Sequence, residues 1–403
     1  MKIHRNIALG IVEGLQQILE KNEALRPCLN KLLKQNRKWG SRDRRQLGEA
    51  VLDCVRWRRT YEYLGTLSLE SENYYWELLG VWLLTKGRTL PGWDELSKLK
   101  DLKISLPINP KAAARKIIES IPDWLDDLGL KSFNETIWIK EIQSLNKTAS
   151  LVLRCNTLKQ DPLKLQKQLK KDFNIEANQH NEIPEALIID KHQNLNQNPL
   201  FLKGFFEIQD ANSQRVARWI DPKPGNLILD SCAGGGGKSL HLAALMKNKG
   251  KIFALDPDPN KLEQLHKRAL RNGVSNIQIL TTGNKEFYLR HKGEIDAVLI
   301  DAPCSGLGVI RRNPAIKWHM NPKKIIELEE LQKDILNKNA PLVKKGGVMV
   351  YATCSIFPNE NKLQIADFIN SKEGEAFELI KDQTFLSNES SFDGFYIAKL
   401  KKS

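Results

Sequence analysis

The chain has 403 residues, 41% hydrophobic and 27% charged, with a formal net charge of +14. This composition is that of a globular protein of two or three domains; no stretch approaches the roughly 20 apolar residues of a membrane span, and the apolar run at the N-terminus is too short for a signal peptide. The positive charge favours a polyanionic partner such as nucleic acid, and we expect a cytoplasmic protein.

Residues 1–145 are predicted to form an all-helical domain. Apolar residues recur at helical spacing at Ile7, Ile11, Leu15, Ile18 and Leu19, and the run RRQLGEAVLDCVRWRRTYEYL shows a second such stripe. The segment between the stripes is basic, which fits an RNA-facing patch and also an ordinary solvated connection. The candidate RNA-binding residues of this segment are Lys34, Arg37, Lys38, Arg42, Arg44 and Arg45.

Residues 146–207 have the pattern of a small α/β module. The runs ASLVLRCNTL, EALIID and GFFEIQD are typical of strands. The run PLKLQKQLKKDF is typical of an amphipathic helix with a basic face. We expect this module to contribute to binding RNA.

Residues 208–403 alternate between strand and helix patterns, which predicts a Rossmann-like, doubly wound α/β domain. Its expected parallel strands are LILD, KIFALD, IQIL, DAVLID and GVMVYAT, and the late runs AFELI and FYIAKL are expected to complete the sheet. The helix PNKLEQLHKRALRNG has Asp258 as its expected N-cap and Gly273 as its stop. Ligands of such a domain bind at the carboxyl ends of the strands.

The first of these strands leads into the glycine-rich stretch CAGGGGK, residues 232–238. A phosphate-binding loop of the Walker type requires glycine where this chain has Cys232, so that interpretation fails. A dinucleotide fingerprint is only partly matched, but a glycine turn between a strand and a helix remains typical of an adenosine cofactor site. Asp256 follows Gly236 by 20 residues, where an acid commonly binds a ribose. NAD and S-adenosylmethionine fit this pattern equally well, and a helix-capping role is the structural alternative for Asp256.

Two of the six cysteines follow predicted parallel strands, in DAPCSGLGVIRRNPAIKW and in YATCSIFPNEN. Cys304 and Cys354 should therefore lie together at the carboxyl edge of the sheet, beside the cofactor. Free cysteines are usually small buried hydrophobes, and only exposed thiols of low pKa react. The cysteines show no spacing typical of a zinc site or a disulfide framework, so no metal is expected.

These two cysteine motifs resemble the fourth and sixth motifs of the Sun-type RNA cytosine carbon-5 methyltransferases, in the RsmB-like branch that acts on ribosomal RNA. The stretches CAGGGGK, EIQDANSQ and LRCNTLK extend the resemblance over residues 148 to 403. The stretch KWGSRDRRQLGEAVLDCVRWRR is similar to the NusB-like RNA-binding domain that precedes this branch.

The resemblance implies an enzyme that transfers a methyl group from S-adenosylmethionine to carbon 5 of a cytosine in RNA, expected to be ribosomal RNA, through a cysteine adduct at carbon 6. It implies that Cys354 is the nucleophile, that Cys304 assists product release and that Asp301 contributes to catalysis. The implied cofactor-binding residues are Cys232, Ala233, Gly234, Gly235, Gly236, Gly237, Lys238, Asp256, Asn284 and Asp301, and Arg311 and Arg312 join the candidate RNA contacts.

The chain departs from the family pattern at several positions. Gly234 and Gly235 replace an alanine and a proline, which should loosen the cofactor loop because proline fixes φ and glycine does not. Asn284 stands where the family has a carboxylate, and Ala315 stands where an aspartate is usual. One alternative is therefore a non-catalytic RNA-binding factor with a decayed cofactor site. Another, an NAD-dependent oxidoreductase, leaves both cysteine motifs unexplained. The target nucleotide and the oligomeric state stay open.

Overall fold

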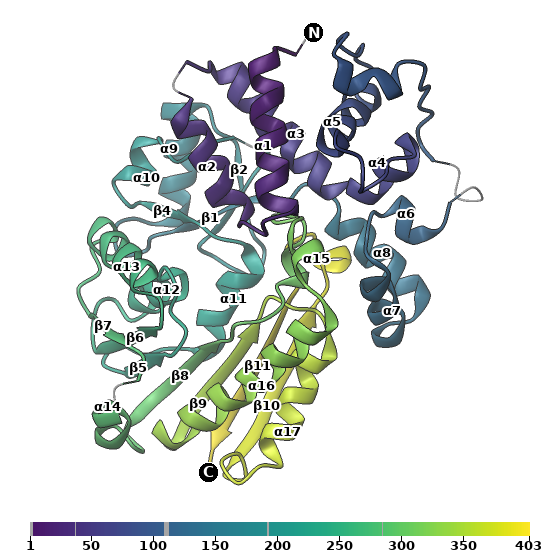
Figure 1. Ribbon diagram of the computed structural model, residues 1–403. Coiled ribbons are helices and arrows are strands. Elements are labelled where there is room, and N and C mark those ends of the chain that lie inside the picture. Colours follow the sequence, from purple (N-terminus) through teal and green to yellow (C-terminus); the bar gives the residue numbers. More distant parts are fainter. Residues whose placement is uncertain (1–2, 37, 109–112, 192, 284) are drawn as a thin grey trace. The chain divides into compact units, whose positions relative to one another are not determined.

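A computed structural model describes residues 3–36, 38–108, 113–191, 193–283 and 285–403 (Figure 1). The chain forms two compact units, one made of Met1–Lys147 and Ile310–Pro322 and the other of Thr148–Val309 and Lys323–Ser403. Within the described ranges, no helix is both long enough and apolar enough to cross a membrane. The first unit ends close to the predicted boundary at residue 145, but it also takes a segment from the range that was assigned to the third domain.

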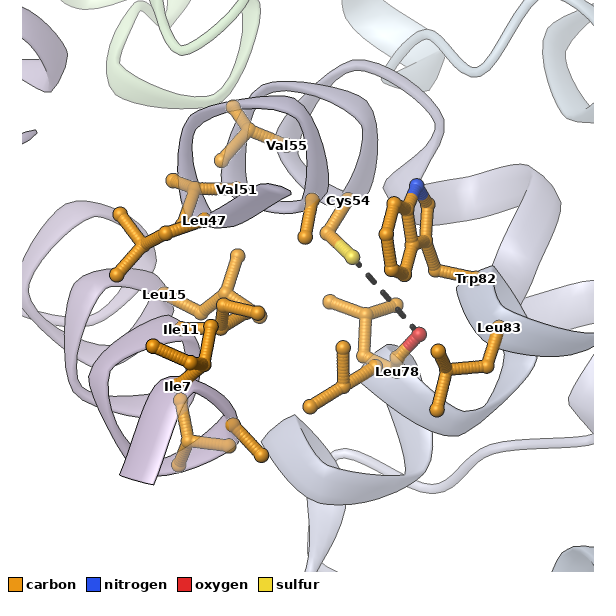
Figure 2. Close-up of a cluster of buried hydrophobic side chains, with 14 of the residues drawn as sticks. Ile7, Ile11, Leu15, Leu47, Val51, Cys54, Val55, Leu78, Trp82 and Leu83 are labelled. Carbon is orange, nitrogen blue, oxygen red and sulfur yellow. Dashed lines mark hydrogen bonds between the residues drawn. The ribbon is translucent and has the colours of Figure 1, made fainter. Parts of the chain in front are cut away.

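The first unit is all helical, as predicted. Its longer helices are α1 (Arg5–Leu19), α2 (Leu25–Gln35), α3 (Ser41–Arg56), α4 (Arg58–Gly65), α5 (Tyr74–Thr85), α7 (Asp123–Ser132) and α8 (Glu135–Leu145). Short helical turns are η1 (Asp94–Leu99), α6 (Arg115–Ile118) and α15 (Ile316–His319). The predicted stripe of α1 is buried from Ile7 to Ile18 and faces apolar residues of α3 and α5, among them Val51 and Trp82 (Figure 2).

The segment Ile310–Pro322 completes this helical unit. Ala315 is fully buried in its apolar core. The side chains of residues 317–319 bind carbonyl groups near the C-terminal ends of α3 and α1, where helices leave carbonyls without intrahelical partners. Lys317 Nζ donates to Arg56 O (2.7 Å), Trp318 Nε1 donates to Val55 O (2.6 Å) and His319 Nε2 donates to Ile18 O (2.7 Å). The unit is therefore not built from residues 1–147 alone.

The second unit contains a four-stranded antiparallel sheet in the order β2-β3-β1-β4. Its strands are β1 (Leu151–Cys155), β2 (Ala177–Gln179), β3 (Ala186–Ile189) and β4 (Phe206–Ile208), with the helices α9 (Pro162–Phe173) and α10 (Pro199–Leu202). Three of the strands and α9 match the predicted elements. The short strand β2 was not predicted, because ANQ has no β-branched or aromatic residue.

The same unit contains a seven-stranded sheet in the order β10-β11-β9-β8-β5-β6-β7 (Figure 1). Strands β5 to β9 pair in parallel, and β11 and β10 pair antiparallel at one side. The strands are β5 (Leu227–Asp230), β6 (Lys251–Asp256), β7 (Ile277–Thr281), β8 (Ile295–Asp301), β9 (Val343–Thr353), β10 (Phe377–Phe385) and β11 (Phe395–Lys402). The predicted Rossmann-like fold class is confirmed.

Helices cover both faces of this sheet. They are α11 (Ala211–Ile220), α12 (Gly237–Leu245), α13 (Pro259–Asn272), α14 (Lys285–Arg290), α16 (Pro322–Asn339), α17 (Lys362–Ile369) and α18 (Ser387–Ser390), with the turns η2 (Leu307–Val309), η3 (Ala340–Leu342) and η4 (Pro358–Glu360). Val216 of α11 and Leu240 of α12 belong to one apolar core, whereas Leu336 of α16 and Ile365 of α17 belong to another. Strand β5 lies between β6 and β8, so the winding reverses there and the loops after β5 and β8 diverge. A ligand site is expected at this switch point.

Replacing Trp318 by alanine should destabilise α1 and α3. The change removes the hydrogen bond to Val55 O and the packing of the ring on the helical core, with an expected cost of roughly 2–4 kcal/mol. Hydrogen exchange should show the loss as faster exchange of the α1 and α3 amides in the full chain. Lys323→Ala, an exposed position just beyond the segment, is the control and should exchange like the wild type. Unchanged protection in Trp318→Ala would show that the segment does not support the helices.

Candidate functional site

The glycine loop lies between β5 and α12, as the sequence predicts. Gly234 and Gly236 have positive φ angles of 53° and 82°, which glycine adopts readily. At Gly236 a side chain is also excluded sterically, since a Cβ there would lie 2.6 Å from Leu265 Cγ. The backbone of the loop is therefore open to a ligand, with the N-terminus of α12 following it.

Side chains from three other elements hold the backbone of this loop. Asp256 at the end of β6 accepts from Gly234 N through Oδ2 (2.9 Å). Arg268 of α13 donates to Gly235 O (2.5 Å), and Arg154 of β1 donates to Gly237 O (2.5 Å). These contacts oppose the loosening expected from the two glycines that replace alanine and proline.

Asp256 faces the glycine loop and does not cap a helix. Its Oδ1 accepts from Asp258 N (2.9 Å), and Asp258 in turn caps α13 by accepting from Asn260 N (2.9 Å). The predicted roles of Asp258 as N-cap and Gly273 as C-cap are confirmed. A strand-end carboxylate beside a glycine turn fits a ligand with ribose hydroxyl groups, so the residues present are compatible with an adenosine cofactor.

Asp301 at the end of β8 is paired with the lysine of the glycine loop. Lys238 Nζ lies 2.5 Å from Asp301 Oδ2. The neighbouring Asp230 is fully buried and accepts from Ser239 Oγ (2.6 Å), and burial raises the pKa of Asp230 to about 7. The ends of β5 and β8 thus present one ion pair and one carboxyl group that ionises with difficulty.

The two predicted thiols meet at the carboxyl edge of the sheet. Cys304 Sγ and Cys354 Sγ are 3.4 Å apart and both side chains are partly exposed. The hydrogen bond between the two thiols and burial together raise the pKa of the Cys304 thiol well above its ordinary value. By contrast, Cys28, Cys54 and Cys155 are buried. The geometry brings together two partly exposed cysteines, of which Cys304 is harder to ionise than a free thiol.

Close backbone packing fixes the distance between the two cysteine loops. Gly308 N donates to Cys354 O (2.9 Å), and Gly394 N donates to Gly308 O (2.8 Å). A Cβ at Gly308 would lie 2.2 Å from Gly394 O and 2.7 Å from Cys354 O. Only glycine fits at position 308, a requirement that the sequence alone did not reveal.

Polar residues in the motif PNEN complete the site, in roles that their pattern did not predict. Asn361 accepts from Thr353 Oγ1 (2.5 Å) and donates to Ser355 O (3.0 Å), which shapes the turn that carries Cys354. Glu360 is fully buried and contacts the Cys304 loop. Both residues belong to this motif, but the sequence does not show that an acid and an amide in a loop are buried.

The candidate RNA-binding residues divide into two groups. Lys34, Lys38, Arg42 and Arg45 are exposed and remain candidates, and Arg312 is half-buried. Arg44 instead closes the connection between α2 and α3, where its guanidinium donates to Leu33 O (2.7 Å), Trp39 O (2.9 Å) and Asn36 O (3.1 Å). Arg311 is buried in the helical unit, which does not favour contact with RNA. Arg37 and Asn284 lie outside the described residues.

Metal coordination is not supported by the side chains that the structure describes. Among these residues, no group of three or more His, Cys, Asp or Glu side chains is arranged to hold a metal ion.

Comparisons with known proteins agree with this geometry. Residues 217–401 match the family described as 16S rRNA methyltransferase RsmB/F, and residues 121–196 match the ferredoxin-like domain of RsmF/B-like methyltransferases. The crystal structure of PH0851 is 25% identical, aligns over 100% of both chains and has a TM-score of 0.83. A methyltransferase homologue from Pyrococcus horikoshii is 26% identical over 73% of this chain and 100% of its own, with a TM-score of 0.65.

Curated relatives carry a consistent name. A Synechocystis protein named "probable ribosomal RNA small subunit methyltransferase B" is 36% identical, over 70% of this chain and 67% of its own length. The ribosomal RNA small subunit methyltransferases B of Yersinia enterocolitica and Vibrio cholerae are 36% and 33% identical, and the alignments span 62% and 65% of their lengths. The chain belongs to the RsmB/F family of ribosomal RNA methyltransferases.

Proposed function

We propose that this protein methylates carbon 5 of a cytosine in small-subunit ribosomal RNA through a covalent adduct with Cys354. The observation that supports the proposal best is the pair of partly exposed thiols, 3.4 Å apart, at the carboxyl edge of the sheet. S-Adenosylmethionine, the methyl donor of the family, supplies the methyl group when bound. We assign its binding to the glycine loop and Asp256, which the geometry makes compatible with an adenosine ligand.

The chemistry requires a nucleophile because carbon 5 of cytosine is too electron-poor to attack a methyl donor. Addition of the Cys354 thiolate to carbon 6 turns the ring into an enamine and makes carbon 5 nucleophilic, which is covalent catalysis. As negative charge develops toward ring nitrogen 3, that nitrogen needs a proton or a hydrogen-bond donor. Asp301 in its protonated form, with the cationic Lys238 beside it, is our candidate for that role.

Release of the product requires two bonds to break. After carbon 5 has received the methyl group, it also carries its original proton. A base accepts that proton, and the electron pair of the carbon–hydrogen bond forms the double bond between carbons 5 and 6. The bond between carbon 6 and Cys354 Sγ breaks, and its electron pair leaves with the sulfur as a thiolate. Cys304, whose sulfur lies 3.4 Å from that of Cys354, assists this elimination.

The RNA must present an unpaired or flipped base, because carbon 6 is inaccessible in a stacked duplex. The exposed residues Lys34, Lys38, Arg42 and Arg45 are proposed to bind the RNA backbone, where basic side chains contact phosphates regardless of sequence. We propose that the protein carries out this reaction in the cytoplasm.

Bisulfite sequencing of small-subunit ribosomal RNA tests the proposal. RNA from cells that contain the protein should carry a protected cytosine that is unprotected in cells without it. Cells that express Cys354→Ala should resemble the cells without the protein. If no cytosine differs between these RNAs, the proposed reaction is wrong.

Asp256→Ala should weaken binding of S-adenosylmethionine by roughly 1.5–3 kcal/mol, the scale of a hydrogen bond to a charged group. The substitution removes the carboxylate proposed for the ribose and also releases Gly234 N. Calorimetric titration without RNA measures the change. Asp258→Ala is the matched control, since that side chain caps α13 and should affect helix stability rather than cofactor affinity. If the two substitutions changed the affinity for S-adenosylmethionine equally, Asp256 would not belong to the proposed cofactor site.

Cys304→Ala should trap a covalent complex with RNA. Cys354 can still add to carbon 6 and the methyl group can still be transferred, but elimination becomes slow. A denaturing gel with labelled RNA should show a retarded, protease-sensitive band for Cys304→Ala. Cys354→Ala and the double variant should show none, because the carbon–sulfur bond never forms. If only Cys354→Ala gave such a band, the assigned roles of the two thiols would have to be exchanged.

A further inference from the structure

Glu360 is a buried acid next to both cysteine loops, and the proposed reaction does not use it. It is the last residue of η4, six positions after Cys354, and its side chain has no exposed surface. Its carbonyl oxygen accepts from Tyr351 OH (2.7 Å), which ties it to β9. A residue held in this way is enclosed by the protein.

The Glu360 carboxylate binds the loop that carries the other thiol. Oε1 accepts from Ser305 N (2.7 Å) and Oε2 accepts from Ser305 Oγ (2.5 Å). Gln332 of α16 donates to Oε1 (3.2 Å) and also to Pro303 O (3.0 Å). The residues on both sides of Cys304 are thereby attached to one carboxylate or to its amide partner.

The partners of this carboxylate are neutral. In the part of the chain that the structure describes, Glu360 forms no ion pair, and a buried charge without a cation is costly. A glutamine could accept the same hydrogen bond from Ser305 N at a smaller desolvation cost. The presence of a carboxylate therefore calls for an explanation in terms of its charge.

One group that responds to this charge is the Cys304 thiol. Ser305, which Glu360 binds, is the next residue in the chain, and the negative charge of Glu360 is one of the causes that raise the pKa of Cys304. When the pair of thiols loses one proton, the remaining proton is then favoured on Cys304. From there it can be donated across the 3.4 Å gap to a thiolate at Cys354.

We propose that Glu360 is a positioning residue that fixes the Cys304 loop against the Cys354 loop and directs the negative charge of the thiol pair to Cys354. This inference rests on the proposed function, in which Cys354 attacks the base. It assigns to a buried residue outside the substrate site the choice of which cysteine is the nucleophile.

Alkylation of the full chain tests the inference without RNA or cofactor. The protein is treated briefly with iodoacetamide near neutral pH, and mass spectrometry of its peptides gives the ratio of label on Cys354 to label on Cys304. Thiolates react and thiols do not, so the ratio reports where the charge lies. The wild type should be labelled mainly on Cys354. In Glu360→Gln the ratio should fall roughly tenfold, as for a change of one pKa unit between the two thiols.

Ser305→Ala is the matched control, because it removes one hydrogen bond to Glu360 but keeps the charge. Its labelling ratio should stay within roughly twofold of the wild type, well below the tenfold change expected for one pKa unit. A ratio unchanged in Glu360→Gln, or shifted equally in Ser305→Ala, overturns the inference. If Glu360→Gln does not fold, preferential labelling of Cys304 in the wild type still overturns it. Since no RNA is present, these results are independent of the bisulfite experiment, whose failure would instead remove the proposed reaction.

Discussion

The parallel register between β8 and β9 is the constraint on which the site depends. Asp301 lies opposite Ala352, so the two strands end at the same level of the sheet. Cys304 and Cys354 follow these positions by three and two residues, and their loops must therefore leave the same edge. Parallel strands need a crossover between them, here through α16, and for this reason two cysteines 50 residues apart in sequence come within 3.4 Å.

This register brings the loops together but does not by itself set their separation. That is set by contacts which tolerate little change, namely the packing of Gly308 against Gly394 and the carboxylate of Glu360 on Ser305. A backbone approach as close as this leaves no room for a side chain at position 308. A buried carboxylate that lost its hydrogen-bond donors would destabilise the fold. The thiols are thus held by a rigid support, although they lie on loops.

Much of this arrangement follows from sequence patterns. The strands ending in Asp230, Asp256 and Asp301 are short apolar runs bounded by turn residues, and α13 has a clear cap and stop, so local signals and the fold agree. The edge on which the cysteines meet follows from the alternation of strands and helices. The resemblance to Sun-type enzymes added their individual roles, which spacing alone left open.

The remaining features depend on contacts between distant parts of the chain. The run RRNPAIKW is basic, and Arg311 and Arg312 were predicted to contact RNA. Its third basic residue, Lys317, is fully buried because carbonyl groups at the end of α3 lie within its reach. Burial lowers the pKa of Lys317 well below its ordinary value. Arg44 shows the same effect, since its three carbonyl partners exist only once α2 and α3 are joined. Charge in a sequence does not distinguish a solvated side chain from one that satisfies buried carbonyls.

The altered glycine loop can be judged on the same physical grounds. If the cofactor site had decayed, nothing would be expected to hold the loop in place of the missing proline. Instead Arg154, Arg268 and Asp256 each bind a different backbone group of the loop. Burial lowers the pKa of Arg154 to about 10. Its guanidinium donates hydrogen bonds to this loop and to Gln209. Glycine makes the loop flexible in the unfolded chain, but side chains from β1, β6 and α13 restrict it in the folded protein, which favours a working site over a decayed one.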